Sequence, residues 1–230
     1  MYDKNNKNSI LSLFNDISSD YDKMNNIMTF GMQKKIKIEA IRKISINSPN
    51  IIVDLCTGTG DMAVLLAEKY PNSKIYAVDF SANMLKIAKD KTKKYKNIEF
   101  LESDIMNLPF EDNSIDLLFI SFGLRNLPDI TESLCFFHRK LKQNGLLSIL
   151  DLGKITPVLK TIFEIYFFRI VPLIGQLVHK NKKPYEYLVN SMPEYPSPTA
   201  ILTEMNNCGF KHLKNHNYLF GALAQQTGVK

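Results

Sequence analysis

The stretch IIVDLCTGTGDMA, residues 51–63, restricts the fold more than any other part of the chain. Its branched apolar start predicts a short buried strand, and Gly58 and Gly60 predict a tight turn into a helix. Turns of this kind hold nucleotide-like ligands, because the backbone can approach a ligand closely at the N-terminus of a helix. The stretch therefore predicts an α/β protein with a bound cofactor.

Strands and helices alternate after this turn. We predict further strands at 74–78, 98–101, 115–121 and 146–150, and helices at 61–70, 81–94 and 128–141. Such alternation is typical of a mostly parallel sheet with helices on both faces.

The length of 230 residues suits a single domain. We divide it into a helical flap (1–46), a cofactor-binding core (47–152), an apolar helical insert (153–207) and a C-terminal hairpin (208–230). The insert is too charged to span a bilayer. It is expected either to pack over the sheet as a lid or to lie on a membrane as an amphipathic helix, and the sequence leaves both open.

Polar residues follow every predicted strand, at the edge where parallel α/β sheets bind their ligands. These residues are Gly58-Thr59-Gly60 after the first strand, Asp79 at the end of the second, Ser103-Asp104 after the third, Ser121 to Asn126 after the fourth and Asp151 at the end of the fifth. We expect them to converge on one site.

The acid Asp54, at the end of the first strand, helps to identify the cofactor. A carboxylate beside the turn would repel the pyrophosphate of a dinucleotide, whereas S-adenosylmethionine carries a cationic sulfonium and an ammonium and no phosphate. The two oxygens of Asp79 can accept both ribose hydroxyls. Asp104 can accept from the adenine amino group while Ile105 packs against the ring. The pattern therefore favours S-adenosylmethionine over a nicotinamide dinucleotide.

The charge balance bears on the choice of partner. The 29 Lys and Arg residues exceed the 23 Asp and Glu residues, which gives a net charge of +6. The lysine clusters at 89–96 and 180–183 lack interleaved aromatics, so we expect no nucleic-acid partner. A nicotinamide oxidoreductase, an RNA methyltransferase and a non-catalytic partner protein remain as alternative function classes.

The cysteines Cys56, Cys135 and Cys208 lie far apart and form no C-x-x-C pair. We therefore predict neither a metal site nor a disulfide, and an intracellular, reduced protein. The N-terminus lacks the apolar core of a signal peptide. The expected location is the cytoplasm, with peripheral attachment to the inner face of the membrane as an alternative, and a homodimer is compatible with the sequence.

Five segments resemble the C-methyltransferases of menaquinone and ubiquinone biosynthesis. They are YDKMNNIMTFG (21–31), DLCTGTGD (54–61), VDFSANML (78–85), LPFEDNSID (108–116) and SFGLRNLPD (121–129). The segments YDxMN and FGLRN are the most specific, because the glycine turn and VDFS occur in many methyltransferases.

The resemblance implies a class I methyltransferase fold with a mostly parallel seven-stranded sheet. It implies S-adenosylmethionine as the methyl donor and a ring carbon of a polyprenylated quinol as the acceptor. Demethylmenaquinol is the favoured acceptor, with a ubiquinone-pathway benzoquinol or another small molecule as the alternative. The residues that match the family's cofactor positions are Thr59, Asp79, Asp104, Ile105 and Ser121.

The chain departs from the family's usual pattern at several positions, which include three in the flap, the KQNG segment (142–145), Asp151-Leu152-Gly153 and Gln225 or Gln226. Thr29, Gln33 and Ile36 stand where the family usually has Ser, His and Trp. These departures lie away from the expected cofactor contacts, so they concern the choice of acceptor more than the type of reaction.

Methyl transfer to a ring carbon requires a positioned ring whose neighbouring hydroxyl can lose its proton. Arg125 and Asn126, after the fourth strand, are the best placed polar residues, and Arg125 can stabilise a phenolate. Tyr21 in the flap is expected to hydrogen-bond the ring oxygen, and Asp22 is a rival base. The alternative for Arg125 is a structural pair with Asp151.

Overall fold

The computed structural model describes residues 6–173, 186–187, 189 and 192–230. Seven strands form one sheet in the order β3-β2-β1-β4-β5-β7-β6, in which only β7 runs antiparallel. The strands are β1 (Ile51–Leu55), β2 (Lys74–Asp79), β3 (Ile98–Glu102), β4 (Ile115–Ser121), β5 (Leu141–Leu152), β6 (Lys211–Tyr218) and β7 (Leu223–Val229). The predicted class I methyltransferase architecture, α/β with a mostly parallel seven-stranded sheet, is confirmed.

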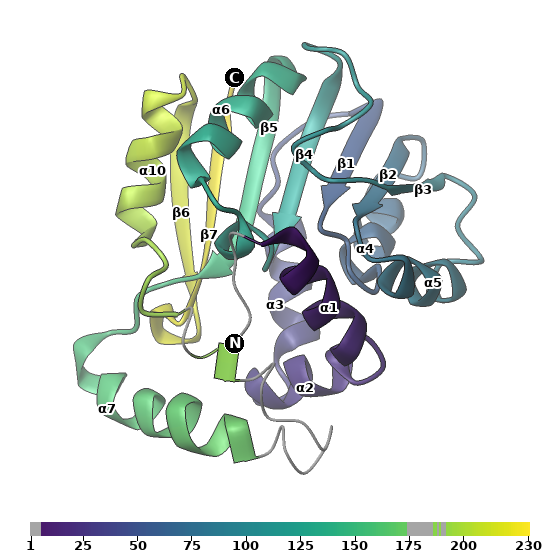
Figure 1. The fold of residues 1–230 in the computed structure, drawn as a ribbon. Coiled ribbons are helices and arrows are strands. Elements are labelled where there is room, and N and C mark those ends of the chain that lie inside the picture. The colour runs from purple at the N-terminus through teal and green to yellow at the C-terminus, as the bar shows by residue number, and fades with distance from the viewer. Residues whose placement is uncertain (1–5, 174–185, 188, 190–191) are drawn as a thin grey trace.

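Helices cover both faces of the sheet (Figure 1). They are α3 (Gln33–Arg42), α4 (Asp61–Lys69), α5 (Ala82–Lys91), α6 (Ile130–Lys140) and α10 (Pro198–Asn207). Alternate residues of β4 point to opposite faces, as the two-residue period of a strand requires. Leu118 and Ile120 pack into the apolar core with α6 and α10. Leu117 and Phe119 pack into a second core with α3 and α4.

The flap also contains α1 (Lys7–Ile17) and α2 (Tyr21–Met28). Both lie at the end of the sheet to which the arrows of β1, β2 and β4 point, so they cover the carboxyl ends of the strands (Figure 1). Short 3-10 turns follow β4 (η1, Leu124–Asn126) and β6 (η3, Leu219–Gly221).

The predicted insert contains α7 (Pro157–Ile165), which continues into a π-helical turn, η2 (Tyr166–Ile170), and it also contains α10. Residues 174–185, 188 and 190–191 of that insert lie outside the described residues. Among the residues that the structure describes, no helix is both long and apolar enough to cross a membrane.

Strand β5 begins five residues earlier than predicted. The expected turn at Asn144-Gly145 is an irregularity inside the strand, where the pairing with β4 shifts between Ile115 and Leu117. Asn144 has a φ of +65°, and a Cβ on Gly145 would lie 2.8 Å from the carbonyl oxygen of Lys142. The turn residues were recognised correctly, but they make a bulge rather than a strand start.

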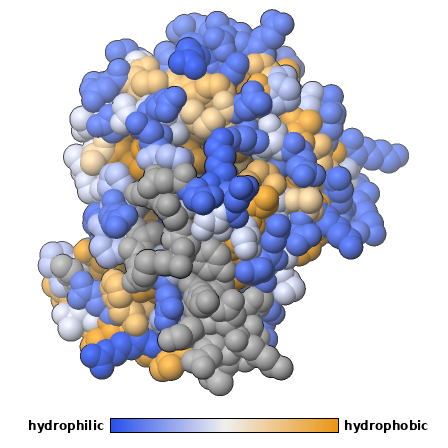
Figure 2. Space-filling view, viewed as in Figure 1, coloured by the Kyte–Doolittle hydropathy of each residue, from blue (hydrophilic) through white to orange (hydrophobic). Residues whose placement is uncertain are grey.

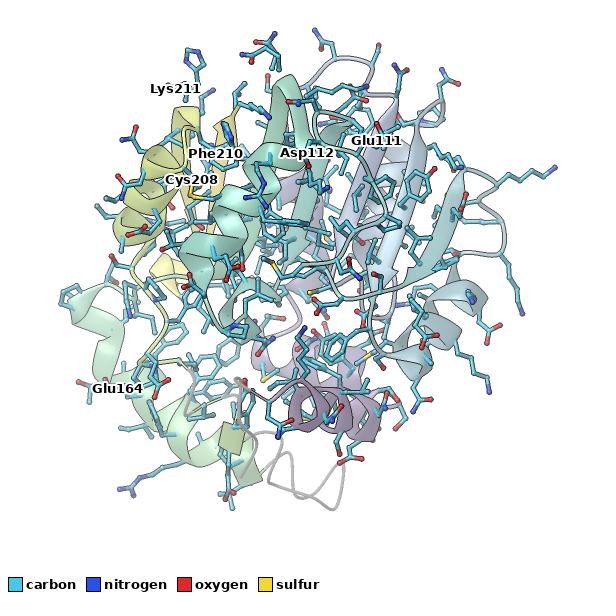
Figure 3. The ribbon with its side chains drawn as sticks, turned by 45° about the horizontal axis from the view of Figure 1, so that its top comes forward. Glu111, Asp112, Glu164, Cys208, Phe210 and Lys211 are labelled. Atoms are coloured by element: carbon cyan, nitrogen blue, oxygen red, sulfur yellow. A yellow bond between two sulfur atoms is a disulfide. The ribbon has the colours of Figure 1, made fainter. Side chains whose placement is uncertain are left out.

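The prediction that the chain has no disulfide is wrong for this structure, in which Cys135 of α6 is bonded to Cys208. These residues are 73 positions apart, but packing of α10 beside α6 brings their Cα atoms to 4.8 Å. Cys208 follows α10 on the face that α6 also covers (Figure 3). No local spacing rule detects such a pair, because tertiary packing alone brings the two thiols together. The expectation of a reduced protein rested on the same missing signal.

Candidate active site

A cavity of about 360 Å³ lies at the carboxyl ends of β1 to β4, beneath α1. Seven of the predicted site residues line it: Tyr21, Gly58, Asp79, Asp104, Ile105, Ser121 and Asn126. Asp54, Thr59 and Arg125 are not among its lining residues.

The glycine turn and Asp79 form one hydrogen-bonded unit. Gly58 has a φ of +55° and donates its backbone N–H to Asp79 Oδ2 at 2.8 Å. The N–H of Ser81 donates to Asp79 Oδ1 at 2.9 Å. Burial raises the pKa of Asp79, although the backbone donors lower it. These donors fix the carboxylate of Asp79 at the cavity wall, where it can accept hydrogen bonds from ribose hydroxyls.

Asp104 sits across the cavity and is paired with the flap. Its Oδ1 accepts the backbone N–H of Met106 at 2.9 Å, and its Oδ2 binds the ammonium of Lys7. Partial burial raises the pKa of Asp104, but the hydrogen bond and charge of Lys7 and the hydrogen bond from Met106 together outweigh burial, and the net pKa is lowered. Ile105 is buried next to it. The sequence did not suggest Lys7 as a site residue.

Asp54 lies under the turn and not in the cavity. The side chain is fully buried, Oδ2 accepts the hydroxyl of Thr57 at 2.6 Å, and Oδ1 has no partner among the described residues. Burial raises the pKa of Asp54 to about 7, against the hydrogen bond from Thr57 and the charge of Lys37. Asp54 is therefore placed to contribute negative charge only through the turn.

Thr59 points toward the flap instead of the cavity. Its hydroxyl donates to Asp22 Oδ1 at 2.6 Å and accepts from Lys91 Nζ at 3.1 Å. Lys91 also pairs with Asp22 at 2.7 Å and with Asp61 at 2.5 Å. Asp22, the rival base, is thus held in an ion-pair network and does not line the cavity.

The three predicted catalytic residues meet beside the cofactor cavity. Tyr21, Arg125 and Asn126 all line a smaller cavity of about 30 Å³. Arg125 Nη1 pairs with Asp151 Oδ1 at 2.9 Å and donates to the carbonyl oxygen of Phe122 at 2.7 Å. The predicted alternative pairing with Asp151 is therefore present, while the guanidinium still borders this cavity.

The pKa shifts of Tyr21 and Arg125 indicate different roles for these two side chains. Burial raises the pKa of Tyr21, although the Arg125 charge lowers it, so the phenol stays a hydrogen-bond donor at neutral pH. Burial lowers the pKa of Arg125, but Asp151, together with Tyr21 and Tyr187, more than offsets this and the net pKa is raised. A neutral donor and a permanent cation thus stand beside each other, as stabilisation of a phenolate requires.

Three long-range ties between flap and core escaped the sequence analysis. Lys7 binds Asp104, Asn15 Oδ1 accepts the hydroxyl of Ser81 at 2.6 Å, and Lys91 binds Asp22. No sequence spacing signals them, since the partners are 66 to 97 residues apart. Together they fasten α1 to the residues that follow β2 and β3, and α2 to the end of α5.

The lining of the large cavity fits a cationic cofactor. Its charged groups are four carboxylates, of Asp79, Asp104, Asp129 and Glu132, and the single ammonium of Lys7, which is already paired with Asp104. A pyrophosphate would meet repulsion there, whereas the sulfonium and ammonium of S-adenosylmethionine would meet attraction. The described residues bring together no group of three metal-ligating side chains.

The chain matches known methyltransferases along its whole length. The model of the "ubiE/COQ5 methyltransferase family" matches residues 1–230. The demethylmenaquinone methyltransferase of Staphylococcus saprophyticus is 34% identical over 226 residues, which cover 97% of each chain. The enzyme of the same name from Staphylococcus aureus strain JH9 is 34% identical, covering 99% of this chain and 95% of the relative.

Solved structures show the same fold. A SAM-dependent methyltransferase from Thermotoga maritima has a TM-score of 0.67 at 19% identity, covering 95% of this chain and 99% of its own. A phosphoethanolamine N-methyltransferase from Haemonchus contortus, in complex with S-adenosyl-L-methionine, has a TM-score of 0.62 at 15% identity, covering 85% and 52%. The chain therefore belongs to the ubiE/COQ5 methyltransferase family and is an S-adenosylmethionine-dependent methyltransferase.

Proposed function

We propose that this enzyme methylates the ring carbon of demethylmenaquinol to give menaquinol. The observation that carries the proposal is the meeting of Tyr21, Arg125 and Asn126 in one small cavity next to the cofactor cavity. The names of the staphylococcal relatives point to the same acceptor. A ubiquinone-pathway benzoquinol is the second candidate, because it offers the same para-dihydroxy ring.

The proposed mechanism uses the ring as a carbon nucleophile. When bound, S-adenosylmethionine supplies an electrophilic methyl group. The acceptor hydroxyl beside the reacting carbon must lose its proton to water, and the Arg125 guanidinium stabilises the resulting phenolate. The ring carbon then takes the methyl group as the bond from that methyl to sulfur breaks, and loss of the hydrogen of that carbon to water as a proton restores the aromatic ring. Tyr21 donates to the same oxygen, and Asn126 holds the ring in place. The cofactor contacts in this proposal are Gly58, Asp79, Asp104, Ile105 and Ser121, with Asp54 acting through the turn.

The experiment is methyl transfer from labelled S-adenosylmethionine to reduced demethylmenaquinone, with the demethyl ubiquinone precursor assayed in parallel. Methylated menaquinol alone supports the proposal. Methylation of the benzoquinol alone would replace it with the second candidate. No product in either assay, with the cofactor still bound, would refute both acceptors.

We further propose that the exposed apolar side of α7 and η2 rests on a membrane. Val158, Ile162 and Leu173 are 89%, 65% and 61% exposed. Hydrophobic atoms gather over this part of the surface, at the lower left of the molecule (Figure 2). Burial of such side chains in lipid is favourable, and it would place the enzyme where a polyprenylated acceptor resides.

Pelleting with anionic liposomes tests this contact. Ile162→Glu should abolish the pelleting, while Gln143→Glu, at the opposite end of the sheet, should leave it intact. If the wild-type protein does not pellet and is a dimer by light scattering, the surface is a homodimer interface instead.

A further inference from the structure

A second cavity, of about 60 Å³, lies under the flap between α3 and α7. Its lining is mostly apolar, and includes Met28, Phe122, Leu152, Phe163, Phe167 and Leu223. Phe122 borders both this cavity and the large cofactor cavity, and Arg125 borders both this cavity and the small catalytic one. The second cavity is therefore adjacent to the cavities in which we place the cofactor and the reacting ring.

Two buried N–H groups of this cavity have no hydrogen-bond partner within the described part of the chain. Gln33 is only 7% exposed, and its Nε2 has no hydrogen bond to any residue that the structure describes. The same holds for Nε of Arg125, whose side chain is 8% exposed. Thr29, by contrast, donates its hydroxyl to the carbonyl oxygen of Asn25 at 2.8 Å. Buried donors without partners are rare in native proteins, because the desolvation of the donor is not compensated.

The chemistry of the acceptor matches these donors. A demethylmenaquinol ring has two hydroxyls on opposite sides. One stands beside the carbon that receives the methyl group, and the other stands beside the carbon that carries the polyprenyl tail. If Tyr21 and Arg125 hold the first hydroxyl, the second points away from the cofactor cavity. Arg125 is already assigned to the first hydroxyl, which leaves Gln33 as the residue with an unpartnered donor in the cavity that Phe163 and Phe167 of the insert also line.

We propose that Gln33 is a positioning residue that hydrogen-bonds the second ring hydroxyl of the acceptor. The inference rests on the proposed function and deepens it. A side-chain amide both donates and accepts, so it can bind a hydroxyl in either orientation. The tail then leaves along the stacked phenyl rings of Phe163 and Phe167, toward the exposed apolar side of α7. Gln33 thereby selects rings with two para hydroxyls and fixes which carbon faces the methyl group.

The test compares two acceptors on two proteins. The first acceptor is reduced demethylmenaquinone, and the second is a 3-prenyl-1-naphthol, which keeps the reacting carbon and its hydroxyl but lacks the second hydroxyl. Gln33→Met replaces the amide by an apolar chain of similar length. We expect it to lower kcat/KM for the diol by about tenfold and to leave kcat/KM for the mono-ol unchanged.

Stability and cofactor affinity give independent readouts. Removing an unpartnered buried amide should leave the melting temperature unchanged or raise it, and the affinity for S-adenosylmethionine should not change. Gln143→Met, an exposed glutamine on β5, is the matched control and should alter neither acceptor. The wild-type enzyme also provides a test without any variant, because its kcat/KM should be higher for the diol than for the mono-ol.

The remaining outcomes overturn the inference. An equal loss for both acceptors would mean that Gln33 acts on the fold or on the first hydroxyl. No loss for either would mean that the amide faces water. Activity of the wild-type enzyme on neither acceptor would instead refute the proposed function, and the inference with it.

Discussion

The buried carboxyl of Asp54 should make the stability of this enzyme depend on pH in an unusual direction. Burial raises the pKa of this group from an ordinary 3.8 to about 7. Between these two pH values the native state binds a proton that the unfolded chain has released. The free energy of unfolding therefore falls as the pH rises through this window. A difference of roughly three pH units, at about 1.4 kcal/mol each, makes this contribution about 4 kcal/mol.

The substitution Asp54→Asn should remove this pH dependence of stability. The asparagine side chain is uncharged like the protonated acid, and it keeps an oxygen that can accept the hydroxyl of Thr57. Urea denaturation at pH 4 and pH 8 measures the effect. Between these values the wild type should lose up to about 4 kcal/mol more than the variant. Asp90→Asn, at an exposed carboxylate paired with Lys93, serves as the control and should behave like the wild type. Parallel pH profiles for the wild type and Asp54→Asn would refute the reasoning, because Asp54 would then titrate as in the unfolded chain.

Three further substitutions test other parts of the structure. Arg125→Met leaves the buried Asp151 without its cation, and should cost about 3–5 kcal/mol of unfolding free energy, seen as a fall in melting temperature of roughly 10 °C. Gly60→Ala forces a side chain into a φ of +84°, and should cost about 1–2 kcal/mol in urea denaturation and weaken cofactor binding in calorimetry. Lys91→Met releases Asp22 and Asp61, and should speed chymotryptic cleavage of the flap by about fivefold.

Each of these substitutions has a matched control. Adding Asp151→Leu to Arg125→Met should recover part of the loss, and no recovery would mean that the unpaired acid is not its cause. Gly31→Ala is the control for Gly60→Ala. Gly31 has a positive φ of +75° with open space around it, whereas a Cβ on Gly60 would lie 3.0 Å from the Cβ of Ala88. Equal effects of the two substitutions would therefore exclude the contact with Ala88 as a cause. Lys93→Met removes an exposed pair and should not affect cleavage.

The parts of the site that follow a local rule could be predicted from the sequence. Asp79 and Asp104 were identified because polar residues at the ends of parallel strands face the ligand edge, and both line the cavity. β4 was predicted at its observed bounds, since its apolar run ends sharply at Ser121. The same rule misplaced Thr59, because it fixes the backbone position of a residue in the turn but not the direction of its side chain.

The contacts that could not be predicted from the sequence are those between residues far apart along the chain. Lys7 and Asp104 are 97 positions apart, and neither residue type nor spacing marks them as partners. The disulfide of Cys135 and Cys208 is of the same kind. The unpartnered amide of Gln33 depends on the absence of neighbours in three dimensions, which a sequence does not record.

The place of β7 in the sheet has a consequence for the order of synthesis. β7 lies between β5 and β6, although it is the last of the described strands along the chain. While a ribosome is still translating the preceding residues, β5 presents an unpaired edge beside an otherwise complete parallel sheet. Such edges recruit strands from other molecules. A nascent chain stalled before residue 223 should therefore aggregate more readily than one released after residue 229, and the late strand acts as the molecule's own edge protection.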